Sequence, residues 1–196
     1  MKTTTKILAM TALLTTAVPL NAQERWGFEF RANTSVSTNE VASESLGAGL
    51  AFEGGVHLRL VHHLGLYAGW DWAHFNPDQS FAGPDMDIEE TGYAFGLRWV
   101  HPLGGEAGDG PAVWLRGGGT WNHLEVEDAE GDLVADSGHG LGWEAGLGLS
   151  VPLAGRWRLT PGVRYRELER PVEVGTVSTD VRLRYVAFEI GFSRAF

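Results

Sequence analysis

The feature of this sequence that most constrains its fold is a strict two-residue alternation of side-chain character, clearest from Arg182 to Phe196. Large apolar residues occupy one parity of this stretch, at Phe188, Ile190, Phe192 and Phe196. The other parity is mostly small or polar and includes Glu189. Because successive side chains of a β-strand point to opposite faces of a sheet, the stretch predicts a strand with one apolar face.

Seven earlier stretches repeat the pattern, at about 26–33, 47–61, 66–72, 92–99, 113–122, 140–151 and 157–166. No long stretch shows the 3.6-residue period of an amphipathic helix. The sequence therefore predicts an all-β protein with eight antiparallel strands. Long connections are expected at 34–45, 74–89, 123–138 and 167–180, and short turns at 61–64 and 152–156. The glycine-rich connection at 101–111 is longer than a turn needs, and no function is assigned to it.

Residues 1–22 are predicted to be a secretory signal peptide. Lys2 and Lys6 precede an apolar run at 7–20, and Ala22 is a small residue at the expected cleavage site. An uncleaved anchor is the alternative, but the run is short for a membrane-spanning helix, which needs roughly 20 apolar residues. The remaining residues, 23–196, are expected to form one domain.

The charge balance excludes several classes of protein. Both lysines lie in the predicted signal peptide, so the mature chain carries 13 arginines against the 25 acidic residues, a net charge near −12. Nucleic-acid binders need a basic surface, and docking onto anionic lipid from solution needs one too. The sequence contains no cysteine, so no disulfide framework holds this exported domain together.

The apolar parity carries seven of the eight tryptophans, and Trp114 is the exception. With strands alternating in direction, they sort into two groups near the strand ends: Trp26, Trp99 and Trp157 with Phe196 at one rim, and Trp70, Trp72, Trp121 and Trp143 at the other. Two aromatic girdles around an aliphatic band are typical of the two interfaces of a membrane. The apolar face is therefore expected to contact lipid.

The opposite parity carries charges of both signs. They are Glu29, Arg31, Glu53, Arg59, Asp71, Arg98, Arg116, Glu144, Arg164, Arg166 and Glu189, together with Glu90 and Arg158. In a closed eight-stranded barrel the lumen is only wide enough for side chains to fill it. Arginine pairs well with enclosed carboxylates, so these residues predict a charge network inside the lumen.

Lipid permits no open sheet edge, so the predicted fold is an eight-stranded antiparallel up-and-down transmembrane β-barrel. Long connections outside and short turns toward the periplasm match the outer-membrane arrangement. A soluble, lipocalin-like barrel is the alternative. It would place the apolar parity inside, where so many Trp and Phe side chains would overfill the lumen.

The chain thus resembles the small eight-stranded outer-membrane barrels, the family of the OmpA transmembrane domain, OmpX and Ail. The resemblance covers the mature chain and rests on the strand count, the girdles, the charged interior and the closing residues Phe188, Ile190, Phe192 and Phe196. It implies a location in the outer membrane, contact with outer-membrane lipid and lipopolysaccharide, and recognition of the C-terminal residues by the barrel-assembly machinery. Arg194 departs from the family pattern.

Two kinds of metal site can be considered near the external rim. Asp85, Asp87 and Glu89 could offer carboxylate oxygens to calcium, and His74, His123 and His139 could offer nitrogen to zinc. The acids lack the spacing of an EF-hand, and the histidines lack a short ligand motif. Solvated loops are the favoured interpretation, and no metal or cofactor is expected.

Three functions remain open. The favoured one is a structural or interaction role, in which the barrel stabilises the envelope or presents its loops to a protein partner. Phe75, Phe81 and the valines at 172, 174 and 177 hint at a contact surface. A narrow pore for ions or small solutes is the alternative. An enzyme acting on lipid is disfavoured, because Asp136, Ser137 and His139 fit the end of a loop better than a nucleophile with its base.

Overall fold

The computed structural model describes residues 25–41, 44–75, 86–104, 110–128, 130–174 and 177–196. The predicted signal peptide, Asp85 and Phe81 lie outside this part of the chain. Eight long strands are present: β1 (Trp26–Ser37), β4 (Ala48–Arg59), β5 (Leu64–Phe75), β6 (Asp87–Pro102), β7 (Ala112–Glu127), β9 (Gly140–Pro152), β11 (Gly162–Val174) and β12 (Val177–Ala195). Four short strands accompany them: β2 (Glu40–Val41), β3 (Glu44–Ser45), β8 (Leu133–Asp136) and β10 (Trp157–Leu159).

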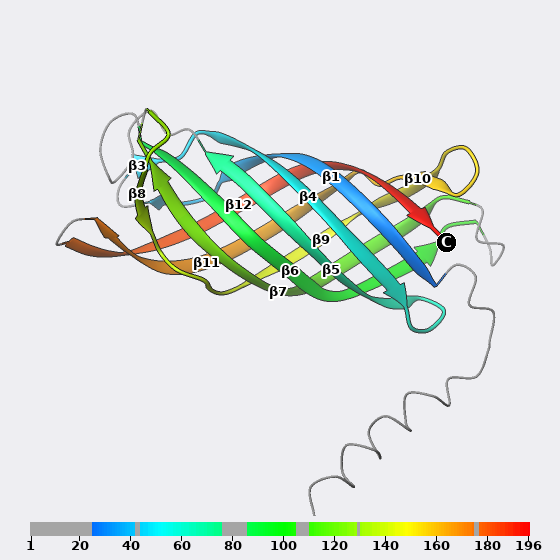
Figure 1. The fold of residues 1–196 in the computed structure, drawn as a ribbon. Coiled ribbons are helices and arrows are strands. Elements are labelled where there is room, and N and C mark those ends of the chain that lie inside the picture. The colour runs from blue at the N-terminus through cyan, green and yellow to red at the C-terminus, as the bar shows by residue number, and fades with distance from the viewer. Residues whose placement is uncertain (1–24, 42–43, 76–85, 105–109, 129, 175–176) are drawn as a thin grey trace, which may run out of the picture.

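The eight long strands form a closed ring of antiparallel pairs (Figure 1). Neighbours in the chain pair in order, β9 bridges β7 and β11, and β12 closes the ring against β1. The closing register places Phe30 opposite Phe192, and the backbone N–H of Phe196 donates to the carbonyl of Trp26 at 2.9 Å. The predicted all-β, eight-stranded antiparallel barrel is confirmed. In the described part of the chain, no helix is long and apolar enough to cross a membrane.

Tight turns lie at the end of the barrel that also carries the C-terminus (Figure 1). Leu60 N–H donates to the carbonyl of Leu64 at 2.9 Å, and Leu153 N–H donates to that of Trp157 at 2.9 Å. Gly155 in the second turn has φ +63°, a left-handed conformation that favours glycine. In outer-membrane barrels the short turns face the periplasm and the longer connections face outward. The end that carries the tight turns and the C-terminus is therefore the periplasmic end.

The predicted long loops proved shorter than expected, because several strands continue through them. β1 runs to Ser37, β6 begins at Asp87, β7 reaches Glu127, and β11 and β12 pair until Val174 faces Val177. β12 has 19 residues, whereas a membrane-crossing strand needs about 9–11. The strands therefore extend beyond the membrane at the external end of the barrel, opposite the tight turns, where the sequence suggested irregular loops.

The predicted seventh strand is interrupted. It divides into β10 and β11 at Thr160 and Pro161, because proline has no N–H to donate to the ladder. Register is unchanged across the break, since Leu159 faces Phe192 and Gly162 faces Glu189 on β12. Thr160 N–H still donates to Gly191 O at 2.7 Å, and Pro161 O still accepts from Leu149 at 2.9 Å. The interruption leaves the barrel closed.

Candidate functional site in the barrel interior

The centre of the lumen is organised around Arg166, which is buried and reaches three carboxylates. Its two terminal nitrogens bind Asp71 through both carboxylate oxygens, at 2.9 and 2.8 Å. They also donate to Glu90 at 2.7 Å and to Glu144 at 2.6 Å. These residues come from β5, β6, β9 and β11. One guanidinium therefore ties together strands from both sides of the barrel.

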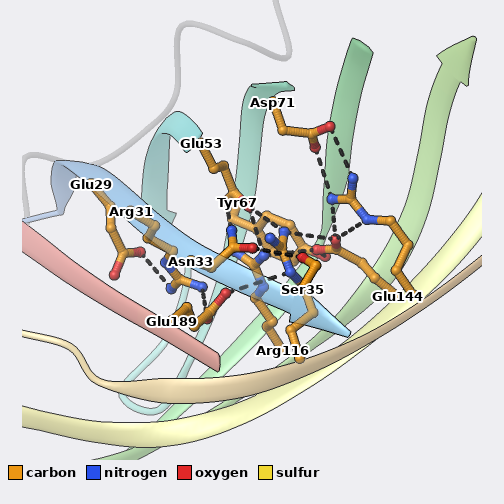
Figure 2. Close-up of polar contacts among 12 residues, drawn as sticks. Glu29, Arg31, Asn33, Ser35, Glu53, Tyr67, Asp71, Arg116, Glu144 and Glu189 are labelled. Carbon is orange, nitrogen blue, oxygen red and sulfur yellow. Dashed lines mark hydrogen bonds and ion pairs between the residues drawn. The ribbon is translucent and has the colours of Figure 1, made fainter. Parts of the chain in front are cut away.

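A second arginine cluster lies beside it around Glu53 (Figure 2). Arg116 donates two parallel hydrogen bonds to Glu53, at 2.7 and 2.8 Å, the geometry that suits an arginine fork. Arg164 donates to Glu53 at 2.5 Å and to Glu144 at 3.3 Å. Glu144 thus belongs to both clusters and joins them into one network.

A third layer lies closer to the periplasmic end. Arg31 lies between Glu29, at 2.8 Å, and Glu189, at 2.6 Å (Figure 2). Its guanidinium stacks on Trp114, 4.7 Å from the ring centroid. Trp114 is fully buried and donates its indole N–H to Leu149 O at 3.0 Å. A Cβ atom at Gly148 would lie 2.6 Å from the Trp114 ring, so glycine makes room for it. The one tryptophan of inward parity therefore fills the lumen.

Of the thirteen predicted lumen charges, the structure brings eleven together in the interior, each with an ion pair to another member. Arg98 is the most weakly held of these, 3.6 Å from Glu29. Arg158 lies nearer the periplasmic end, where it donates to the Ser150 hydroxyl and to Gly110 O. Arg59 lies elsewhere: it is exposed at the last residue of β4. Because Arg59 is the last residue of β4, its side chain lies at the periplasmic opening of the barrel and not beside the network.

Several interior partners were missed by the sequence analysis. Tyr67 donates its hydroxyl to Glu144 at 2.8 Å, Tyr185 donates to Glu90 at 2.8 Å, and Asn122 donates to Glu90 at 2.6 Å. All have inward parity, which is the only signal that could have selected them. Which carboxylate each one meets depends on the stagger of strands across the barrel, and the alternation does not contain that information.

Between the charge network and the end of the barrel opposite the tight turns, the lumen is filled by apolar side chains. The buried cluster comprises Leu46, Ala51, Ala73, Phe75, Ile88, Leu124, Val126, Ala135, Leu168, Val172, Val181, Leu183, Tyr185 and Ala187. The predicted contact surface is wrong for Phe75 and Val172, which are 0% and 1% exposed and belong to this interior cluster. Phe81 lies outside the described residues, as do the side chains at 174 and 177.

This apolar cluster fills the strand extensions beyond the membrane, here called the external extension: residues 87–89, 123–127, 133–136, 167–174 and 177–184. Its outward face is acidic, unlike the outward face below it. On β6 the outward residues change from Asp87 and Glu89 to Tyr93, Phe95 and Leu97. Apart from Arg170, which is buried and donates to backbone carbonyls, the external extension therefore has the polarity of a water-soluble barrel, with apolar residues inside and charges outside.

The apolar band below the external extension is exposed and ends in aromatic residues. Six of the predicted girdle tryptophans are substantially exposed and Trp72 is half-buried; the exposed ones are Trp26, Trp70, Trp99, Trp121, Trp143 and Trp157. Phe196 is exposed beside them, as are Phe188, Ile190 and Phe192 on the outward face of β12. Tyr93 lies between Trp70 and Trp121 on neighbouring strands and completes the outer belt.

The candidate metal ligands lie on the outward face of the external extension. Glu89 faces Glu125 and Asp87 faces Glu127 across the β6–β7 pair, and His74 contacts Glu89 at 3.0 Å. Burial and the neighbouring carboxylates of Glu89 and Glu125 raise the pKa of Glu127. Oxygens of Glu89, Glu125 and Glu127 converge within 4.8 Å, as do ligand atoms of His123, Glu125 and Asp136. Asp85 lies outside the described residues.

The residues considered for catalysis, Asp136, Ser137 and His139, make contacts that do not form a nucleophile and base pair. The Ser137 hydroxyl accepts from the N–H of Leu124 at 2.8 Å and donates to Gly138 O at 2.9 Å. Asp136 contacts His123 at 3.1 Å, and the ring of His139 stacks on His123 with centroids 4.4 Å apart. Burial raises the pKa of Asp136, but the Gly138 N–H and His123 outweigh that effect and lower it. Ser137 therefore ends a strand connection, and its hydroxyl is satisfied by backbone groups.

A closed antiparallel barrel with an apolar outward band, two aromatic belts and a charged interior defines an integral outer-membrane barrel. A family model for the outer membrane protein beta-barrel domain matches residues 8–196, so the chain belongs to that family and lies in the outer membrane. The predicted resemblance to the small eight-stranded outer-membrane barrels is confirmed.

Solved structures share this fold at low sequence identity. The Neisserial surface protein A is 15% identical, with a TM-score of 0.61, over 87% of this chain and 96% of that chain. OprG from Pseudomonas aeruginosa is 14% identical, with a TM-score of 0.58, over 89% and 97%. AlkL is 16% identical, with a TM-score of 0.51, over 89% and 90%. No curated protein matches the chain.

Proposed function

We propose that this protein is a non-conducting outer-membrane barrel that stabilises the envelope and presents its external extension to a protein partner. The observation that carries the proposal is the filling of the lumen. Arg166 with its three carboxylates spans the centre, and the apolar cluster of the external extension lies above it. A continuous file of water would have to disrupt both layers.

Interior charges can serve either stability or conduction, depending on whether they satisfy one another. Glu53 with Arg116 and Asp71 with Arg166 make paired hydrogen bonds of 2.7 to 2.9 Å. Removing one partner from such a pair leaves a buried charge uncompensated, which costs several kcal/mol. A lumen of this kind favours one rigid, closed arrangement, which suits a structural role.

The external extension supports the second half of the proposal. Strand pairing carries it beyond the membrane, and its apolar interior gives it a fixed shape. Leu133 and Val134 in β8 remain exposed, next to the acidic outward face of β7. Exposed apolar residues bordered by charge fit a protein contact. Lipopolysaccharide around the barrel and the assembly machinery acting on Phe188, Ile190, Phe192 and Phe196 are the further partners we propose.

Conductance in planar bilayers at neutral pH tests the proposal. The mature protein should give no steady openings, since the lumen is filled. The double variant Glu53→Ala/Arg116→Ala removes both members of one pair and keeps the net charge, and it should conduct more than the wild type. Arg164 loses its contact with Glu53 but keeps Glu144 at 3.3 Å and Glu189 at 3.4 Å. Heat-dependent migration on a detergent gel would verify that both proteins are folded. Steady, reproducible openings of the wild type would instead establish the narrow pore.

A further inference from the structure

A cavity of about 560 Å³ lies at the end of the barrel opposite the external extension, and we call it the periplasmic mouth. Its walls come from the turn after β4, the turn after β9 and the periplasmic ends of the neighbouring strands. Residues that line it include His62 and Arg156 from the two turns and Ser193 from β12. Its volume falls in the range of small-molecule sites, about 300–1,000 Å³.

The described lining of the periplasmic mouth is basic and includes no acidic residue. Glu29, which does not line the cavity, lies 3.6 Å from Arg98 and 2.8 Å from Arg31. The cationic or potentially cationic lining residues are Arg25, His57, Arg59, His62, His63, Arg98, Arg156 and Arg158. Five of the 13 arginines that follow the predicted signal peptide therefore gather at one cavity, in a chain with 25 acidic residues. Like charges repel, so such a cluster favours an anion among them.

Two buried nitrogen atoms in the lining have no hydrogen-bond partner among the described residues. They are Nε of Arg98 and Nδ1 of His57. The Arg98 side chain is only 8% exposed, and its contact with Glu29 is 3.6 Å long. Arg166, by contrast, makes five hydrogen bonds to carboxylates in the central network. A buried polar group without a partner is costly. Nε of Arg31, Arg116 and Arg164 lacks a partner too, but the terminal nitrogens of those arginines bind carboxylates at 2.5–2.7 Å. Arg98 has only the 3.6 Å contact with Glu29, so its guanidinium keeps donors for a ligand in the cavity.

Arg158 has a different role in the same wall. Its Nε donates to the Ser150 hydroxyl at 2.7 Å, and a terminal nitrogen donates to Gly110 O at 2.7 Å. Arg158 thereby holds β9 and the connection after β6 in place. Arg25 and Arg59 lie on the open side of the cavity, where Arg25 is half-buried and Arg59 exposed. Arg98 is buried, so the cavity has one arginine in its inner wall and two arginines near its opening.

We propose that the periplasmic mouth binds a phosphate-bearing anion through Arg25, Arg59 and Arg98. The guanidinium fork matches the oxygens of a phosphate group and pairs with two of them at once. Phosphate could come from solution in the periplasm or from the headgroup of a lipid in the inner leaflet. The second source is within reach, because Trp157, which belongs to the aromatic belt at this end, also lines the cavity.

The test uses the mature protein in a nonionic detergent, titrated calorimetrically with inorganic phosphate and with pyrophosphate. Wild type should bind with a stoichiometry of one. Arg25→Gln/Arg59→Gln should weaken binding at least about tenfold, since each lost hydrogen bond to a charged group is worth roughly that factor or more. Arg98→Gln tests the base of the cavity and should also weaken binding. Arg182→Gln/Arg184→Gln removes the same charge from the external extension and should bind as the wild type does.

Nanodiscs separate the two sources of phosphate. If phosphatidylglycerol in the disc prevents phosphate binding while phosphatidylcholine allows it, the ligand is an anionic headgroup; equal binding in both discs assigns it to solution. Absence of binding to the wild type in detergent and in both discs would overturn the proposal, as would equal losses in the control variant.

Discussion

The membrane-crossing part of the barrel and the external extension are built from the same strands, yet their polarity is opposite. On β11, Val163 and Tyr165 face outward below the outer belt while Arg164 and Arg166 face inward. A few residues later Glu167 and Glu169 face outward, while the inward positions are taken by Leu168, Arg170 and Val172. Arg170 is the one inward charge of this stretch, and it donates to the backbone carbonyls of Asn122 and Leu141 at 3.0 and 2.9 Å. The alternation never changes phase. What changes is which face is apolar.

The comparison teaches that the surroundings of each segment decide its pattern. Hydrocarbon accepts apolar side chains and rejects charge, so the charges of the lower part must be enclosed and paired. Water accepts charge, so the external extension buries its apolar residues in the ordinary way. The boundary between the two parts lies at the outer aromatic belt. There the indole N–H of Trp72, in the membrane-crossing part, donates to Glu89 of the external extension at 2.9 Å.

The largest expected effect comes from removing the centre of the charge network. Arg166→Met leaves Asp71, Glu90 and Glu144 without their common partner, and we expect a loss of about 3–5 kcal/mol in the free energy of unfolding. Urea unfolding in lipid vesicles measures it. Arg182→Met, which breaks an exposed ion pair with Glu169 in the external extension, is the matched control and should change little. Equal effects would abolish the distinction between the two regions.

A cavity in the external extension should produce a local effect of the next size. Leu168 is 1% exposed and pairs across β11 and β12 with Leu183. Leu168→Ala should cost about 2–5 kcal/mol, because a well-packed core collapses only partly around the space. Hydrogen exchange should show faster opening of residues 167–184 while the membrane-crossing strands stay protected. Uniform loss of protection would mean that the two regions unfold as one.

A charge placed on the outward face sharpens the comparison further. Leu147 is 59% exposed in the middle of β9, and Leu147→Arg should destabilise the barrel by about 2–4 kcal/mol, the range for arginine near the bilayer midplane. Glu173→Arg puts the same side chain on the outward face of the external extension and should leave stability unchanged. Unfolding in vesicles compares the two, and similar costs would place both positions in water or both in lipid.

The smallest effect concerns the acidic outward face. Like charges directly opposite on neighbouring strands repel, so Glu127→Gln should raise stability at neutral pH by no more than about 0.5 kcal/mol, because the site is largely solvated. The raised pKa of Glu127 means that the folded state binds its proton more readily. Stability of the wild type should therefore fall as pH rises through that pKa, and the variant should lack this part of the pH dependence. An unchanged profile would remove Glu127 as the cause.

The sequence alone predicts the strands, the closure and the inward set of charges, because all three follow from a period of two and the need to satisfy every strand edge. It fails where the apolar face changes sides. Glu89 and Glu125 share a parity with the lipid-facing residues, so their segments were interpreted as loops. The stagger that brings Tyr67 to Glu144 and the position of Arg59 at the mouth are properties of the assembled barrel.

The account depends on where hydrocarbon ends on the outward face, and spin labelling measures this directly. The chain has no cysteine, so single substitutions at Val163, Tyr165, Glu167 and Glu169 can each carry one label in lipid vesicles. Collision rates should favour oxygen at Val163→Cys and a water-soluble nickel complex at Glu169→Cys, with the crossover between residues 165 and 167. A label on Val163→Cys that is freely reached by the nickel complex would contradict the assignment of the apolar face to lipid.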